Sequence, residues 1–190
     1  MSATTVRRPG ALLAIAAILG SCGGPEPSAV SNLDTTGILL VAIGEQVQSK
    51  PPNEALAQAL SDALLQAEAN GVDIGYPVID PVSGELVVSA ASQRGRELLQ
   101  AASIPVPHRI RNVTHGAGEL RRILDDVTFL GSRGVPDASL IFMTVPDQRD
   151  NRALIVISAM SRSLLDYLAA HYPPDALAVQ VDPTFSITGP

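Results

Sequence analysis

Residues 140–158 read L-I-F-M-T-V-P-D-Q-R-D-N-R-A-L-I-V-I-S. Two short apolar runs, 140–145 and 153–158, stand on either side of the polar segment 146–151. That segment contains Pro, Asp and Asn, which favour turns because their rings or side chains stabilise bent backbone conformations. The pattern predicts a β-hairpin whose two strands pair antiparallel.

An earlier part of the chain has the same arrangement. Residues 72–79 and 85–91 flank the turn sequence D-P-V-S-G at 80–84, which predicts another hairpin. A helix and a strand are predicted after each hairpin. They are helix 93–102, an extended connector at 104–107 and strand 108–114 after the first, and helix 161–171 and strand 177–181 after the second.

Segments 72–114 and 139–182 therefore share one order of elements. Short sequence matches accompany it: 86–88 (L-V-V) with 154–156 (L-I-V), and 96–99 (R-E-L-L) with 162–165 (R-S-L-L). The match needs a gap of two residues, so a true internal duplication and a convergent pattern both stay open.

Three further elements complete the prediction. The apolar run 38–43 lies between glycines and favours a buried strand. Asn53 is the expected N-cap of an alanine-rich helix at 55–69. A second helix is indicated by apolar residues at helical spacing. The expected apolar faces are Leu56, Leu60, Leu64 and Ala67 in the first helix, and Leu120, Ile123, Leu124 and Val127 in the second.

The order of elements over residues 108–182 is strand, helix, strand, strand, helix, strand, which is the ferredoxin-like order. We therefore predict an α+β fold of two layers, with a mainly antiparallel sheet and helices on one face. The domain is expected to cover residues 37–183, followed by an irregular tail at 184–190.

Composition limits the partners. Apolar residues make up 46 % of the chain, aromatic residues only 3 %, and the net charge is -6. Scarce aromatic side chains and negative charge argue against nucleic acid as a partner, because such binders use stacking platforms and cationic surfaces. The single cysteine, Cys22, rules out a disulfide framework within the fold.

The beginning of the chain, R-R-P-G-A-L-L-A-I-A-A-I-L-G-S-C at 7–22, has the charged, apolar, small-residue order of a secretory signal. Its ending, L-G-S-C, resembles the lipobox of bacterial lipoproteins. The resemblance implies that residues 1–21 are a signal peptide, that cleavage falls between Ser21 and Cys22, and that lipid is attached to Cys22. A plain secretory signal and a short transmembrane anchor are the alternatives.

The segment 22–36 is rich in Gly, Pro, Ser and Thr and predicts a flexible tether. Together with the lipobox, it implies a protein held by lipid at the cell membrane or outer membrane, facing the periplasm or the cell exterior.

One segment, H-G-A-G-E at 115–119, offers candidate site residues. His115, Gly116 and Gly118 at a helix start suggest a weak anion or ligand site, because backbone N–H groups are free there. The alternative is that Gly116 is only an N-cap, with Glu119 in the capping-box position. His115 and Glu119 lack further converging ligands, so we predict no metal, no cofactor and no catalytic residue.

The sequence leaves three candidate functions for the domain. The first is a non-enzymatic, lipid-anchored module that binds an envelope protein or has a structural role. The second is a protease inhibitor or folding chaperone acting in trans, because residues 151–182 resemble parts of small protease pro-domains. The third is an enzyme that uses His115, Glu119 or arginines in a cleft, and we expect the chain not to be an enzyme.

Overall fold

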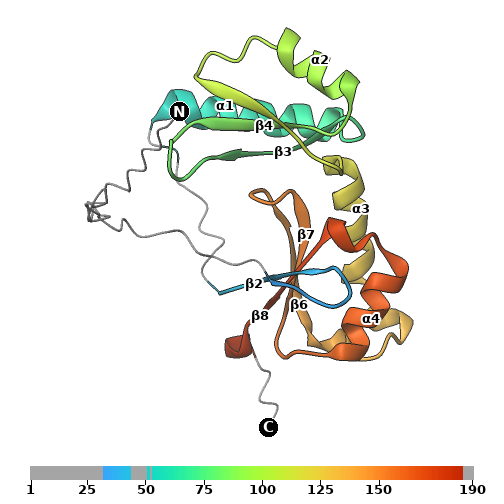
Figure 1. The fold of residues 1–190 in the computed structure, drawn as a ribbon. Helices are drawn as coiled ribbons and strands as arrows, with labels where there is room; N and C mark the ends of the chain where they lie inside the picture. Colours follow the sequence, from blue (N-terminus) through green and yellow to red (C-terminus); the bar gives the residue numbers. More distant parts are fainter. Residues whose placement is uncertain (1–31, 44–50, 52, 186–190) are drawn as a thin grey trace, which may run out of the picture.

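The computed structural model describes residues 32–43, 51 and 53–185, which form two β-sheets and the helices packed on them (Figure 1). The α+β class predicted from the sequence is confirmed. The predicted signal peptide, its cleavage site and Cys22 lie outside the described residues.

The smaller sheet contains the first predicted hairpin. Strands β3 (Ile74–Ile79) and β4 (Leu86–Ala90) pair antiparallel. Helix α2 (Gln93–Ala101) then returns the chain to β5 (His108–Asn112), which pairs parallel to β4. Helix α1 (Glu54–Ala69) contacts β3 and β4, and both helices lie beside this sheet at the top of Figure 1.

The larger sheet has the order β1-β2-β8-β7-β6 and contains the second predicted hairpin. Strands β6 (Ile141–Asp147) and β7 (Arg152–Ile157) pair antiparallel. Helix α4 (Arg162–His171) follows and leads to β8 (Leu177–Val181), which pairs parallel to β7.

Two short strands extend the larger sheet beyond β8. Strand β2 (Leu39–Val41) pairs parallel to β8, and β1 (Asn32–Leu33) pairs antiparallel to β2. Helix α3 (Ala117–Thr128) connects the two halves of the fold, because it contacts β6 and β7 as well as β3 and α1.

The predicted sheet was wrong in its details. Instead of one mainly antiparallel sheet there are two mixed sheets, with parallel pairs β2–β8, β4–β5 and β7–β8. The predicted elements do follow each other along residues 108–182, but β5 belongs to a different sheet from β6, β7 and β8. The helix after each hairpin explains the parallel pairs β4–β5 and β7–β8, since a helical crossover brings the next strand back parallel to the previous one.

The two hairpin, helix and strand segments have the same topology and nearly the same register. Each hairpin turn begins at an aspartate, Asp80 or Asp147, whose Oδ1 accepts the backbone N–H groups two and three residues further on. Each turn ends at a residue with positive φ, +69° at Gly84 and +52° at Asn151. The two turns therefore share these features and occupy equivalent positions in two similar units.

A second shared feature connects each hairpin to its helix. Ser92 caps α2 with its hydroxyl and donates a hydrogen bond of 2.6 Å to Asp73, just before β3. Ser161 caps α4 in the same way and donates to Asp137 at 2.7 Å. In both units an aspartate that precedes the hairpin is thus hydrogen-bonded to the N-cap serine of the helix that follows the hairpin.

The register of the two units differs from the sequence match. Leu86 and Ala153 form the first pairs of the parallel ladders in their units. Leu86 therefore corresponds to Ala153, and the predicted match of 86–88 with 154–156 is shifted by one residue. Because side chains alternate along a strand, this shift would exchange the two faces of β7.

The apolar core is shared by both sheets and the helices. The predicted stripe of α3 is confirmed: Leu120, Ile123, Leu124 and Val127 are all buried. In α1 the buried face is Leu56, Ala59, Ala63 and Ala67, whereas Leu60 and Leu64 are only partly buried. The stripe predicted for α1 was therefore rotated, and its alanine face lets the helix backbone approach the sheet closely.

The domain begins earlier than predicted. Strand β1 starts at Asn32, inside the segment predicted as tether, because a turn at Asp34 folds the chain back. The Asp34 carboxylate accepts the Thr36 N–H at 3.1 Å and pairs with Arg162 at 3.2 Å. At the other end Phe185, in the predicted irregular tail, stacks on Phe142 with ring centroids 4.0 Å apart.

Candidate functional site

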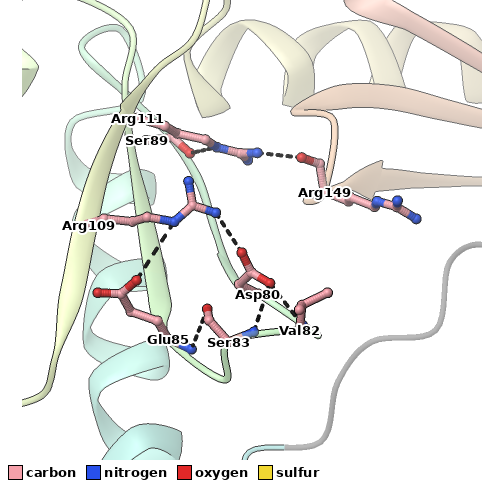
Figure 2. Close-up of polar contacts among 8 residues, drawn as sticks. All are labelled: Asp80, Val82, Ser83, Glu85, Ser89, Arg109, Arg111 and Arg149. Atoms are coloured by element: carbon pink, nitrogen blue, oxygen red, sulfur yellow. Dashed lines mark hydrogen bonds and ion pairs between the residues drawn. The ribbon is translucent and has the colours of Figure 1, made fainter. Parts of the chain in front are cut away.

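The turn between β6 and β7 contacts the open face of the smaller sheet. Arg111 on β5 makes this connection: its Nε donates to Ser89 Oγ at 2.8 Å and its Nη2 donates to the Gln148 carbonyl at 2.6 Å. Its Nη1 donates to the Arg149 carbonyl, and Figure 2 shows Arg111 between Ser89 and Arg149. The guanidinium therefore holds the turn through neutral oxygens.

Asn151, at the end of that turn, makes the second connection. Its Oδ1 accepts the Tyr76 backbone N–H at 2.9 Å, and its Nδ2 donates to the His115 carbonyl at 2.7 Å. Asn151 is only 2 % exposed. Gly75 is needed beside it, because a Cβ at that position would lie 2.6 Å from Asn151 Oδ1.

Asp147, at the start of the turn, is buried with one oxygen lacking a hydrogen bond. Its Oδ1 accepts two backbone N–H groups of the turn, while Oδ2 has no partner among the described residues. Burial raises the pKa of this carboxyl, the nearby Asp150 raises it further, and the turn N–H groups oppose the rise.

An open pocket of about 260 Å³ lies where the turn meets the end of β5. It is lined by three chain segments: residues 111–115, residues 149–152 and Asp175. Three arginines and two aspartates contribute charge to its wall, together with the His115 imidazole. The pocket is therefore polar and is built by both units of the fold.

Two of these arginines form no ion pair with a carboxylate within the described part of the chain. Arg111 bonds only a hydroxyl and two carbonyls, and Arg152 Nη1 donates to the Leu177 carbonyl at 3.1 Å. Burial lowers the pKa of the Arg111 guanidinium, and the nearby Asp150 and Asp147 carboxylates oppose this fall. Arg111 stays charged, because an arginine does not deprotonate in proteins.

Other arginines on the molecule show the opposite pattern. Arg109, next to Arg111 on β5, pairs with Asp80 at 2.7 Å and with Glu85 at 3.9 Å (Figure 2). Backbone N–H groups of the turn, followed by Arg109, hold the pKa of Asp80 below its usual value. Arg109 is therefore ion-paired with two carboxylates, whereas Arg111 and Arg152 form no ion pair within the described residues.

His115 lies on the pocket wall between two carboxylates. Its side chain is 9 % exposed, with Nδ1 at 3.1 Å from Glu119 and Nε2 at 3.2 Å from Asp175. The Asp175 contact has ion-pair distance without hydrogen-bond geometry, so Nε2 has no hydrogen-bond partner among the described residues. Glu119 reaches His115 instead of closing a capping box on Gly116.

The structure gives Gly116 and Gly118 a packing role. Gly118 donates its N–H to the Gly71 carbonyl at 2.9 Å, so this group is already engaged. A Cβ on Gly116 would lie 2.0 Å from the Gly71 oxygen. Gly116 is the N-cap of α3, as the alternative interpretation had it. Of the three predicted site residues, only His115 lines the pocket.

Sequence reasoning missed Arg111, Asn151 and Arg152. A sequence signal for Asn151 is the equal length of the turns D-P-V-S-G at 80–84 and D-Q-R-D-N at 147–151, which places Asn151 opposite Gly84. His108 does not line the pocket. Its Nδ1 lies 3.0 Å from the Val106 carbonyl oxygen.

Comparisons with known proteins add no family: no family model matches the chain, and no curated protein matches it. Within the described residues, no group of three or more metal-ligating side chains converges. In the same part of the chain, no helix has both the length and the apolar character needed to cross a bilayer.

Proposed function

We propose that the protein is a lipid-anchored cell-envelope lipoprotein whose folded domain is a non-enzymatic binding module. The anchor is supported by the lipobox at residues 19–22, with Cys22 as the lipidated residue and Ser21 as the last residue of the signal. The predicted tether, shortened to 22–31 by strand β1, separates this anchor from the domain.

The pocket supports binding as the role of the domain. Its cationic groups are arginines, and a guanidinium keeps its proton at neutral pH. Arginine therefore recognises anionic groups by charge and by its fork of N–H donors, and it does not exchange protons with a substrate. The observation that carries this proposal is the pair Arg111 and Arg152, which line one pocket without forming an ion pair to a carboxylate in the described chain.

A protease inhibitor acting in trans is the second candidate. One observation favours it: the first hairpin turn projects from the domain, with Val82 92 % exposed at its tip. Asp80 accepts a hydrogen bond from the Val82 N–H and another from Arg109, and these contacts brace the turn (Figure 2). A braced, exposed loop loses little conformational entropy when it enters a cleft, which is what an inhibitory loop requires.

Intact mass of the membrane-extracted protein tests the anchor. We expect a mass equal to residues 22–190 plus a diacylglyceryl group, and we expect Cys22→Ala to abolish both the lipid and the membrane association. An unlipidated protein released into the medium would refute the anchor. Co-purification of a protease with that released protein, lost in Val82→Asp, would then favour the inhibitor.

A further inference from the structure

We propose that the pocket at the end of β5 binds a small oxyanion, a carboxylate or a phosphate group, between Arg111 and Arg152. This inference rests on the proposed role of the domain as a binding module and names the class of its ligand. The pocket wall also includes Asn112, Thr114 and His115.

Charge is the first argument. The whole chain carries a net charge of -6, yet arginines outnumber aspartates on the pocket wall. Most arginine contacts elsewhere on the described surface include a carboxylate, as at Arg109, Arg133 and Arg162. The half-buried Arg111 guanidinium bonds only neutral oxygens, and the charges of Asp150 and Asp147 act on it without forming an ion pair. An oxyanion in the pocket would give it a direct charge-assisted hydrogen bond.

Geometry is the second argument. A guanidinium has five N–H donors in a planar fork. Arg111 uses three of its donors on Ser89, Gln148 and Arg149, and these contacts fix its position. Arg152 uses one, on the Leu177 carbonyl. Both side chains therefore have donors that no described residue occupies, on groups already oriented by the fold.

His115 supplies an independent observation. Its Nε2 is buried on the same wall and lacks a hydrogen-bond partner among the described residues. Buried polar nitrogens are almost always hydrogen-bonded in folded proteins, so an unsatisfied one indicates a missing partner. A ligand that displaces the exposed Asp175 side chain from its position 3.2 Å away would supply that partner.

The two aspartates of the pocket wall limit the charge of the ligand, and the pocket volume limits its size. Asp150 and Asp175 are exposed at the rim, so a long polyanion would meet negative charge on either side. The volume of about 260 Å³ is below the range of about 300–1,000 Å³ usual for drug-sized ligands. A single carboxylate or phosphate group on a small molecule fits both limits.

The test is titration calorimetry on the full chain carrying Cys22→Ala, with sodium phosphate in one series and sodium succinate in the other, at constant ionic strength. We expect at least one of the two anions to bind with a Kd below about 1 mM. The anion that binds more tightly identifies the ligand chemistry. Arg152→Gln should weaken that binding about tenfold or more.

Arg122→Gln is the matched control, because Arg122 is an exposed arginine on α3 outside the pocket. It should leave the affinity unchanged. If Arg152→Gln does not fold, Arg152→Lys replaces it, and a loss of affinity is again expected because a lysine ammonium lacks the fork of donors.

Two results would overturn the inference: no binding of either anion up to about 10 mM, or equal affinities for the Arg152 and Arg122 variants. The two proposals fail separately. A lipidated protein without anion binding keeps the anchor and loses this pocket, whereas an unlipidated protein that binds the anion keeps the pocket alone.

Discussion

Asn151 accepts the backbone N–H of Tyr76 at 2.9 Å and thereby fastens the hairpin turn of one unit to the edge strand of the other. The equivalent residue of the first turn, Gly84, has no atom near the position of a Cβ. Both residues have positive φ, which Asn and Gly tolerate best. A position that only shapes the turn in the first unit has therefore become a connection between units in the second.

Replacing Asn151 should weaken the whole domain. In Asn151→Gly the positive φ is kept, but the Tyr76 N–H and the His115 carbonyl lose their buried partner. Each unsatisfied group costs about 1–3 kcal/mol, so we expect the loss of both partners to lower the free energy of unfolding by about 2–6 kcal/mol. Urea denaturation measures this. Gly84→Asn is the control and should change stability by less than about 0.5 kcal/mol.

Replacing Gly116 tests the close packing of Gly116 against Gly71 at the start of α3. Gly116→Ala places a Cβ 2.0 Å from the Gly71 carbonyl oxygen, so the two backbones must move apart. We expect a loss of about 1–3 kcal/mol in the free energy of unfolding, as for overpacked sites. Gly131→Ala is the control, since nothing lies within 4 Å of its Cβ position. Equal stability of the two variants would contradict the close contact.

The N-cap serines Ser92 and Ser161 should contribute equally to the free energy of unfolding. Ser92→Ala and Ser161→Ala each remove a cap and a hydrogen bond to the aspartate before the hairpin. We expect each variant to lose about 1 kcal/mol of stability by urea denaturation. A loss confined to one variant would mean that the equivalence of the two units does not extend to energetics.

Sequence reasoning succeeded where local patterns determine the structure. The strands of both hairpins, the Asn53 cap and the buried stripe of α3 follow from spacing and turn chemistry within a few residues. These features depend on neighbours in sequence. The division into two sheets depends on long-range pairing, because residues 108–182 have the same order of elements whether β5 joins β6, β7 and β8 or not.

The pocket was harder to foresee for a related reason. Arg111 and Arg152 are both ordinary arginines in strands, and nothing near them in sequence distinguishes them from the surface arginine Arg109. They come together because the second turn docks on the first sheet, through contacts that span 37 and 38 residues of chain. The glycines of 115–119 stood out in the sequence, yet their constraint is the approach of Gly71.

The two equivalent aspartates, Asp80 and Asp147, should respond to pH with opposite sign. Hydrogen bonds and Arg109 lower the pKa of Asp80 from 3.8, so its native carboxylate contributes stability above that pH. This contribution is lost as the pH falls through the folded pKa. Burial raises the pKa of Asp147 from 3.8, so its native state holds the proton more tightly and stability falls as the pH rises from 3.8 through the folded pKa.

Asn variants at the two positions isolate these effects, because Asn keeps the acceptor oxygen of the turn and removes the charge. At pH 7 we expect Asp80→Asn to be less stable than the parent chain and Asp147→Asn to be more stable, measured by urea denaturation. On acidification to below pH 3.8 both differences should shrink, since the parent carboxyls become protonated. If Asp147→Asn is destabilising at pH 7 to the same degree as Asp80→Asn, then the two turns are electrostatically alike and burial of Asp147 has no consequence for its charge.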